Sequence, residues 1–307
     1  FANKIKNAAR FITMHLDGFE PGAPQLDTPA DKWIFSRLAK LVRGIDESFE
    51  AFEFSEITRQ LYTFFWNELC DWYIEFSKSR LSQDGDQSDK LACQRNLVAL
   101  LDTSLRLLHP IMPFVTEQIY SSLPKSDDAS DMLILSKWPS TDELSGYIDD
   151  DAERKVSLIC DVVGAVRSAR ARYSISPKTE LVVCIKADSD TCAMLLDQEA
   201  LIVSMARISD LKSAPDMQKP TDSCVGIGTG IEIYTIMSGL VDFKAERERL
   251  ERELGSIDKD VAKFEKKLSN PGFLAKAAKE IIEKDTAKLA ALKEKQTKLK
   301  EQIEELS

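Results

Sequence analysis

The sequence predicts a mainly α fold: an antiparallel helical bundle, followed by a small α/β module and a C-terminal antiparallel coiled-coil hairpin. Three observations lead to this prediction. Apolar residues recur at helical spacing over the first 125 residues. Short apolar runs bounded by turn residues replace that spacing after Glu180. In the last 66 residues, apolar positions again alternate three and four residues apart, as in a coiled coil.

Residues 55 to 81 form the predicted centre of the bundle. Seven of the 24 aromatic residues lie between Leu61 and Phe76, so burial of this segment dominates the packing energy. We expect Ser55 to cap the helix. Two adjacent apolar rows predict contacts with at least two other helices. The rows are Ile57, Leu61, Phe65, Leu69, Trp72 and Phe76, and beside them Tyr62, Trp66 and Tyr73.

The other helices of the bundle are placed by the residues that begin them. The second start is a capping box, in which Asp31 follows the N-cap Thr28 by three residues and Pro29 takes the first helical position. Later helices follow a turn rich in Asp and Gly and a proline-containing break. The four predicted starts are Phe1, Thr28, Ser88 and Pro113.

The first helix has two different faces. Its core row is Ile5, Ala9, Ile12 and Leu16. A second face mixes an aromatic ring with basic and amide side chains, and its residues are Lys4, Asn7, Phe11 and Met14, with Arg10 beside them. Phe11 either packs against a neighbouring helix or offers a stacking platform for an unpaired base. The residues alone leave both interpretations open.

The middle of the chain is a linker followed by the α/β module. Residues 126 to 151 are rich in Ser and Asp and have linker composition. Residues 152 to 238 form the module, with a helix at about 152 to 171, a buried strand at 181 to 185, a helix at about 191 to 205, and a hairpin closed near residues 228 to 230. The spaced glycines at 226, 228 and 230 lie between two strands and are not followed by a helix, so we reject a nucleotide-loop interpretation.

Residues 239 to 307 form the predicted coiled-coil hairpin, which Asn270-Pro271-Gly272 interrupts. The chain has a net charge of −10, yet residues 259 to 300 hold 12 basic and 6 acidic side chains. This local excess allows the hairpin to meet a polyanion although the whole chain is acidic. The lysines crowd the half of the hairpin near its tip: Lys263, Lys266, Lys267, Lys276, Lys279, Lys284 and Lys288.

The composition of the chain argues against a zinc-binding protein and against a membrane-spanning protein. Six cysteines without a CxxC pair, and only two histidines, give no support to a zinc site, so we expect reduced, buried thiols. No apolar run approaches the roughly 18 to 20 residues that span a bilayer. We therefore expect a monomeric, cytoplasmic protein with no membrane partner. The chain opens within a predicted helix, which suggests the C-terminal piece of a longer protein.

Several motifs resemble the C-terminal part of the bacterial valyl-tRNA synthetase family. Bundle motifs of this kind also fit other synthetases for aliphatic amino acids. Cys70-Asp71-Trp72-Tyr73, the C-terminal hairpin and the lack of a four-cysteine zinc module point to the valine enzymes. The motifs are Asn3-Lys4-Ile5-Lys6-Asn7-Ala8-Ala9-Arg10-Phe11, Phe65-Trp66-Asn67-Glu68-Leu69-Cys70-Asp71-Trp72-Tyr73, Leu108-His109-Pro110-Ile111-Met112-Pro113-Phe114, Trp138-Pro139 and Asn270-Pro271-Gly272-Phe273-Leu274-Ala275-Lys276-Ala277. Lys6, Pro271 and Ala278 depart from the family pattern.

The resemblance implies a function for each part. Residues 1 to 125 would be the anticodon-binding domain, with Arg10 and Phe11 at the position that reads and stacks on the valine anticodon, and Lys4 and Asn7 beside them. The hairpin lysines would bind the body of tRNA(Val). The parent enzyme would be a class I aminoacyl-tRNA synthetase that attaches valine to tRNA with ATP and Mg²⁺. This chain lacks the catalytic motifs of that enzyme, so we expect it to be inactive alone and to bind no cofactor.

An alternative is a structural or protein-interaction module. In that interpretation the coiled coil docks a partner, and Phe11 belongs to the core. The two hypotheses differ in their salt dependence, because lysine contacts with phosphate weaken steeply as salt rises.

Overall fold

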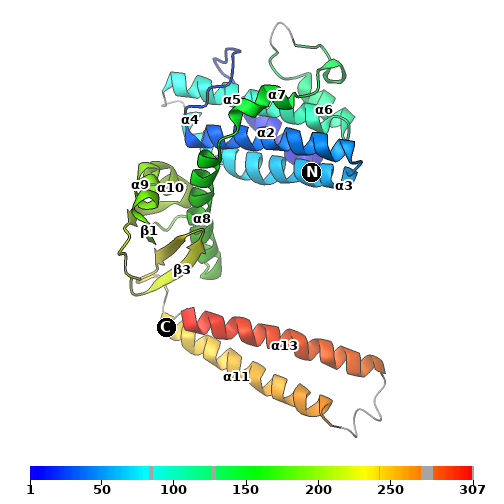
Figure 1. Ribbon diagram of the computed structural model, residues 1–307. Helices are drawn as coiled ribbons and strands as arrows, with labels where there is room; N and C mark the ends of the chain where they lie inside the picture. Colours follow the sequence, from blue (N-terminus) through cyan, green and yellow to red (C-terminus); the bar gives the residue numbers. More distant parts are fainter. Residues whose placement is uncertain (83–85, 126–128, 242, 271–278, 306–307) are drawn as a thin grey trace. The chain divides into compact units, whose positions relative to one another are not determined.

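A computed structural model describes residues 1–82, 86–125, 129–241, 243–270 and 279–305 (Figure 1). The chain divides into two compact units, Phe1–Cys160 and Asp161–Ser307, which are described separately. Most of the described residues are helical, with one small mixed sheet and a C-terminal helix pair. The mainly α class, the sheet module and the helix pair are therefore confirmed.

The first unit is built from helices joined by short segments. The helix α5 contacts α1, α2, α3, α4 and α6, so it shares the centre of the unit with the aromatic segment. The elements are α1 (Ala2–Met14), α2 (Pro29–Glu50), α3 (Phe54–Tyr62), the π-helix η1 (Thr63–Tyr73), α4 (Ile74–Arg80), α5 (Gln87–Leu108), α6 (Pro113–Tyr120), η2 (Leu133–Leu135), α7 (Thr141–Leu144) and η3 (Ser145–Tyr147). The helix α8 (Asp150–Arg172) begins in this unit and continues into the next.

The aromatic segment is helical, but the prediction of one regular α-helix is wrong. It is divided into α3, η1 and α4, and in η1 hydrogen bonds reach five residues back, as from the Ile74 N–H to the Leu69 carbonyl. The wider turn rotates the apolar rows, so Tyr73 is fully buried whereas Tyr62 is 43% exposed. Ser55 is not the cap, because the helix begins at Phe54 after Glu53.

The predicted capping box at the start of α2 is confirmed. The Asp31 backbone N–H donates to the Thr28 hydroxyl at 3.1 Å, and the Asp31 carboxylate accepts from the Thr28 N–H at 3.1 Å. The same carboxylate is fully buried. It accepts a 2.6 Å hydrogen bond from the Tyr73 hydroxyl and pairs with the Arg80 guanidinium at 2.8 Å. One side chain thus joins the start of α2 to the ends of η1 and α4.

The start of α5 differs from the prediction by two residues. The Asp86 side chain, not that of Ser88, is the cap, and it accepts from the Ser88 N–H at 3.2 Å. Asp89 lies in the first turn of this helix and pairs with Arg80 at 2.6 Å. Pro113 opens α6 as predicted.

The segment predicted as a linker contacts α2 along much of its described length. The Trp138 indole N–H and the Thr141 hydroxyl both donate to the Asp46 carboxylate, at 2.8 and 2.7 Å. The Asp149 N–H donates to the Ser36 hydroxyl at 3.0 Å. Polar composition therefore marks a segment held by hydrogen bonds to α2, not a chain without contacts.

The second unit begins with the α/β module. Its sheet has the order β2-β1-β4-β3, in which β1 and β2 are parallel and the other neighbours antiparallel. The strands are β1 (Leu181–Lys186), β2 (Ile208–Ser213), β3 (Ser223–Gly228) and β4 (Ile231–Ile236). The predicted helix between β1 and β2 is two helices, α9 (Ser189–Asp197) and α10 (Glu199–Ala206). The edge strand β2 was not predicted, because its pairing partner β1 lies distant in the sequence.

The spaced glycines of the hairpin have structural roles, as the sequence indicated. Gly230 closes the turn between β3 and β4 with a φ of 76°. Gly226 lies so close to α8 that an added Cβ would be 2.6 Å from the Cβ of Ala165. Close approach of a helix to the strand, and not phosphate binding, explains this glycine.

The C-terminal helix pair consists of α11 (Phe243–Leu268) and α13 (Lys279–Glu305). Its buried apolar residues belong to the predicted rows, and they are Leu250, Ile257, Val261 and Leu299. Ion pairs join the two helices, at 2.8 Å for Glu253 with Lys295 and 2.7 Å for Glu265 with Lys293. The predicted tip, with Phe273 and Leu274, lies outside the described residues.

Over the residues that the structure describes, each helix is too short or too polar to cross a bilayer.

The buried carboxylate of Asp31 leads to a prediction about stability. We expect Arg80→Met to lower the free energy of unfolding by about 3–5 kcal/mol, because it leaves a buried charge without its ionic partner. Urea unfolding followed by circular dichroism measures the loss. The matched control is Lys78→Met, which removes a half-exposed lysine paired with Glu75 and should cost less than about 1 kcal/mol. Equal losses in both variants would contradict the role assigned to Asp31.

Candidate nucleic-acid interface

The face of α1 predicted to bind unpaired bases is largely accessible. Burial of Ile5, Ala8, Ala9 and Ile12 fixes which side of the helix faces the rest of its unit. Asn7 and Arg10 are exposed on the other side, and Phe11 is half-buried. The Met14 side chain continues this face and is 69% exposed. Three of the four predicted residues therefore share one accessible surface.

Lys4 is used differently from the other three residues. Its ammonium group donates to the Asp71 carboxylate at 2.8 Å and lies 4.7 Å from the centroid of the Trp66 ring. The hydrogen bond to Asp71 raises the pKa of Lys4, against the opposing effect of partial burial. The opposite charge and the aromatic face hold α1 against η1. Lys4 is thus engaged in positioning α1.

Phe11 has one neighbour that the sequence analysis did not identify. The His15 ring lies one helical turn later, with its centroid 4.3 Å from that of Phe11 and its plane inclined by 38°. The His15 Nδ1 is 2.7 Å from the Phe11 carbonyl oxygen. The spacing of four residues was the available signal, since residues i and i+4 are neighbours on a helix. His15 therefore limits the positions that the Phe11 ring can take.

The lysines of the helix pair fall into two groups. Lys267 forms a 2.7 Å ion pair with Asp285 on the facing helix. Four others are exposed and have no ion-pair partner among the described residues, and these are Lys263, Lys266, Lys284 and Lys288. Lys276 lies outside the described residues, and of Lys279 only the backbone is described. Of the lysines predicted to bind the tRNA body, these four therefore offer accessible positive charge in the described part.

Asp285 occupies an apolar position of the helix pair. It is 7% exposed, and Lys267, which reaches it, is 41% exposed at the side chain. A buried polar pair in a coiled coil lowers stability but favours one register of the two helices. The pair thus fixes how the exposed lysines of α11 and α13 are aligned.

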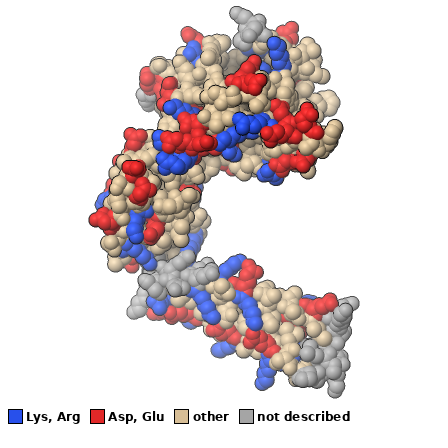
Figure 2. Space-filling model, viewed as in Figure 1, with Lys and Arg blue, Asp and Glu red and all other residues tan. Residues whose placement is uncertain are grey.

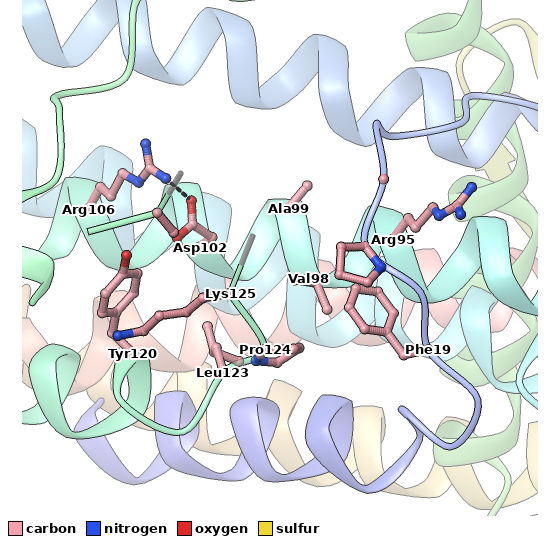
Figure 3. Close-up of a pocket in the computed structure, with 13 residues that line it drawn as sticks. Phe19, Arg95, Val98, Ala99, Asp102, Arg106, Tyr120, Leu123, Pro124 and Lys125 are labelled. Carbon is pink, nitrogen blue, oxygen red and sulfur yellow. Dashed lines mark ion pairs between the residues drawn. The ribbon is translucent and has the colours of Figure 1, made fainter. Parts of the chain in front are cut away.

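A separate cavity of about 160 Å³ lies beside α5 (Figure 3). Its three cationic side chains are engaged already. Arg106 pairs with Asp102 at 2.6 Å, Lys125 lies 4.6 Å from the Tyr120 ring centroid, and Arg95 donates to a loop carbonyl at 3.0 Å. Burial raises the pKa of Asp102, and the charge of Arg106 opposes the change. None of the residues predicted to bind tRNA lines this cavity.

Among the described residues, no cluster of three or more His, Cys, Asp or Glu side chains could hold a metal ion. Four of the six cysteines, Cys70, Cys93, Cys184 and Cys192, are buried. Burial raises the pKa of the Cys70 thiol to about 12 and that of Cys93 to about 11, so these two thiols stay protonated near neutral pH.

Comparison with known families agrees with this arrangement. Residues 31–185 match the family model of the anticodon-binding domain of tRNA ligases. The match covers half of the chain, and the chain belongs to this family. Residues 242–307 match a second model, the tRNA binding arm of valyl tRNA synthetase, which coincides with the helix pair. The candidate residues of α1 precede the first match and are not covered by it.

Relatives that align with almost the whole of this chain show which tRNA ligases it resembles. The chain is 36% identical to the valine–tRNA ligase of Symbiobacterium thermophilum, with 99% of this chain and 35% of the relative aligned. It is 35% identical to that of Carboxydothermus hydrogenoformans and 34% identical to that of Geobacter sulfurreducens, over 100% of this chain and 34% and 35% of those relatives. The chain spans about a third of the length of these curated relatives. The predicted resemblance to bacterial valyl-tRNA synthetases is confirmed.

The contribution of the Lys267–Asp285 ion pair to the stability of α11 and α13 can be tested directly. We expect Asp285→Leu to stabilise the helix pair by about 1 kcal/mol or more, because an apolar side chain replaces a buried charge while Lys267 can extend into water. Thermal unfolding of the 307-residue chain followed by circular dichroism measures the change. Asp260→Leu, at an exposed position of α11, is the control and should have little effect. If Asp285→Leu instead lowers the stability, the ion pair with Lys267 stabilises the two packed helices.

Proposed function

We propose that this chain is the tRNA-recognition part of a valine–tRNA ligase. In this proposal α1 reads the anticodon loop of tRNA(Val), and the helix pair binds the body of the tRNA. The observation that carries the proposal is the accessible face of Asn7, Arg10 and Phe11 on α1. The match to the anticodon-binding family model supports it. The whole protein would attach valine to tRNA, as the names of its relatives suggest. The family resemblance implies that this reaction uses ATP and Mg²⁺.

The chemistry of the α1 face suits unpaired bases. An anticodon loop presents bases that can stack on an aromatic ring and accept or donate at their edges, whereas duplex RNA hides its sequence in a narrow major groove. Phe11 supplies a ring, Arg10 a planar set of donors, and Asn7 both a donor and an acceptor. Lys4 supports the face from behind by holding α1 against η1.

The helix pair suits the phosphate backbone of a folded RNA. We propose that α11 and α13 form an antiparallel coiled-coil hairpin, since residues early in α11 pair with residues late in α13. At about 1.5 Å per residue, each arm is on the order of 40 Å long. Four exposed lysines on this rod can lie along phosphates without reading sequence. We propose that the chain acts as a monomer in the cytoplasm and binds no cofactor itself.

Anticodon reading by α1 predicts a specific loss in one variant. Phe11→Ala should weaken binding of a fluorescein-labelled tRNA(Val) by about 1–3 kcal/mol, because one base loses its stacking partner. Fluorescence anisotropy of the tRNA against the 307-residue chain measures it. The same tRNA with its central and third anticodon bases exchanged should bind the unchanged chain more weakly.

A matched control is available in the same unit. Phe114 is 92% exposed and lies in no ring contact among the described residues, so Phe114→Ala should leave tRNA affinity unchanged. If Phe11→Ala binds both tRNAs as the unchanged chain does, anticodon reading by this residue is wrong.

The lysine contacts predict how binding depends on salt. Each phosphate contact lowers the logarithm of affinity by about 0.7–0.9 per tenfold increase in salt. We therefore expect the double variant Lys263→Gln, Lys266→Gln to have a smaller slope of log affinity against log salt, by up to the contribution of two phosphate contacts. Lys298→Gln, at a lysine paired with Glu294, is the control and should leave the slope unchanged. A flat salt response in the unchanged chain would favour the protein-interaction alternative.

A further inference from the structure

The turn that joins α2 to α3 carries a continuous row of aromatic rings. Phe52 and Phe54 are 77% and 61% exposed, and their ring centroids are 6.4 Å apart. Phe54 contacts Phe49 at 6.4 Å, and Phe49 contacts Trp138 at 5.7 Å, with all three contacts edge to face. We call these four residues the aromatic strip. Single exposed rings are common on protein surfaces, but a connected strip is typical of a binding surface.

Phe52 adopts a backbone conformation that its side chain disfavours. Its φ is 57°, in the left-handed region where Gly and Asn are common and bulky residues are rare. The turn is closed around it by a 2.8 Å hydrogen bond from the Glu53 N–H to the Ser48 carbonyl. The core gains little from this ring, which is mostly in water. A strained backbone that presents an exposed ring therefore indicates a role outside folding.

The charge of the turn between α2 and α3 is acidic, and the exposed Lys137 next to Trp138 is a basic residue beside the strip. Between Arg43 and Arg59 the sequence holds five carboxylates and no basic residue. Two of them have local partners, since Asp46 accepts from Trp138 and Glu56 pairs with Arg59. Acidic side chains gather where α2 meets α3 (Figure 2). The carboxylates that are exposed, and lack an ion pair among the described residues, are Glu47, Glu50 and Glu53.

This charge decides between classes of partner. A nucleic acid could stack bases on the rings, but its phosphates would face several carboxylates within about 10 Å, the screening length at 0.1 M salt. A second copy of the same surface would bring six exposed glutamates together. A polypeptide with apolar side chains flanked by Lys or Arg satisfies both the rings and the carboxylates.

We propose that the aromatic strip and its three glutamates form a docking site for a basic amphipathic helix of a partner protein. Aromatic residues are the usual anchors of such interfaces, and opposite charge at the rim aligns the partner. The site is chemically the opposite of the lysine-bearing helix pair. It therefore serves an interaction separate from tRNA recognition.

The test uses a synthetic helical peptide of Leu and Lys, with Leu at spacings of three and four and a fluorescent label. Anisotropy should report binding to the 307-residue chain. Phe52→Asn combined with Phe54→Ala should weaken binding about tenfold or more, because the anchoring rings are removed. Asn is chosen because it tolerates the left-handed conformation, so circular dichroism should show an unchanged fold.

Three controls separate this site from general attraction. Phe114→Ala removes a ring elsewhere that is even more exposed and should leave peptide binding unchanged. Glu47, Glu50 and Glu53 changed together to Gln should weaken binding and flatten its salt dependence, whereas Glu180→Gln should not. A peptide of Leu and Glu should not bind.

Three outcomes would overturn the proposal. The first is peptide affinity that is equal in the unchanged chain and in the Phe52, Phe54 variant. The second is weaker tRNA binding in that variant, which would assign the rings to RNA. Self-association of the chain that the same variant abolishes would likewise replace the peptide partner by a second copy.

Discussion

The carboxylate of Asp31 is the interaction on which the first unit depends. It accepts the backbone N–H of the N-cap Thr28 at the start of α2, accepts the Tyr73 hydroxyl, and pairs with Arg80, which in turn pairs with Asp89 at the start of α5. Burial raises the pKa of Tyr73, so its hydroxyl remains a donor to this carboxylate. A buried charge tolerates little displacement, because each lost partner leaves desolvation uncompensated. The helix ends that meet at Asp31 are therefore fixed in relation to one another.

The π-helix links that constraint to the candidate RNA surface. Because η1 ends with Tyr73 at Asp31, its earlier residues Trp66 and Asp71 are placed where Lys4 of α1 can reach both. These contacts and the buried apolar row of α1 determine which side of that helix remains accessible. The orientation of Asn7, Arg10 and Phe11 thus follows from packing at some distance from them. π-helical turns are frequent near functional sites, and here the turn acts through its neighbour.

Opposite charges are gathered on different elements of this acidic chain. The helix pair offers exposed lysines, and the turn between α2 and α3 offers glutamates around exposed rings. Local charge, not the net charge of −10, decides which polymer each surface can approach. An acidic chain can accordingly bind tRNA through one element while another element repels it.

The sequence by itself determined features whose cause is local. It was enough for the capping box at Thr28, the turn at Gly230, the apolar rows of α1 and α11, and the family resemblance, because each depends on residues near in sequence. Only the tertiary structure decided the π-helix, the engagement of Lys4 and Lys267, and the packing of residues 138 to 149 on α2. Those outcomes depend on partners far along the chain, such as Asp71 for Lys4. Helical periodicity shows which face of a segment is apolar, but it does not show which distant charge that segment will meet.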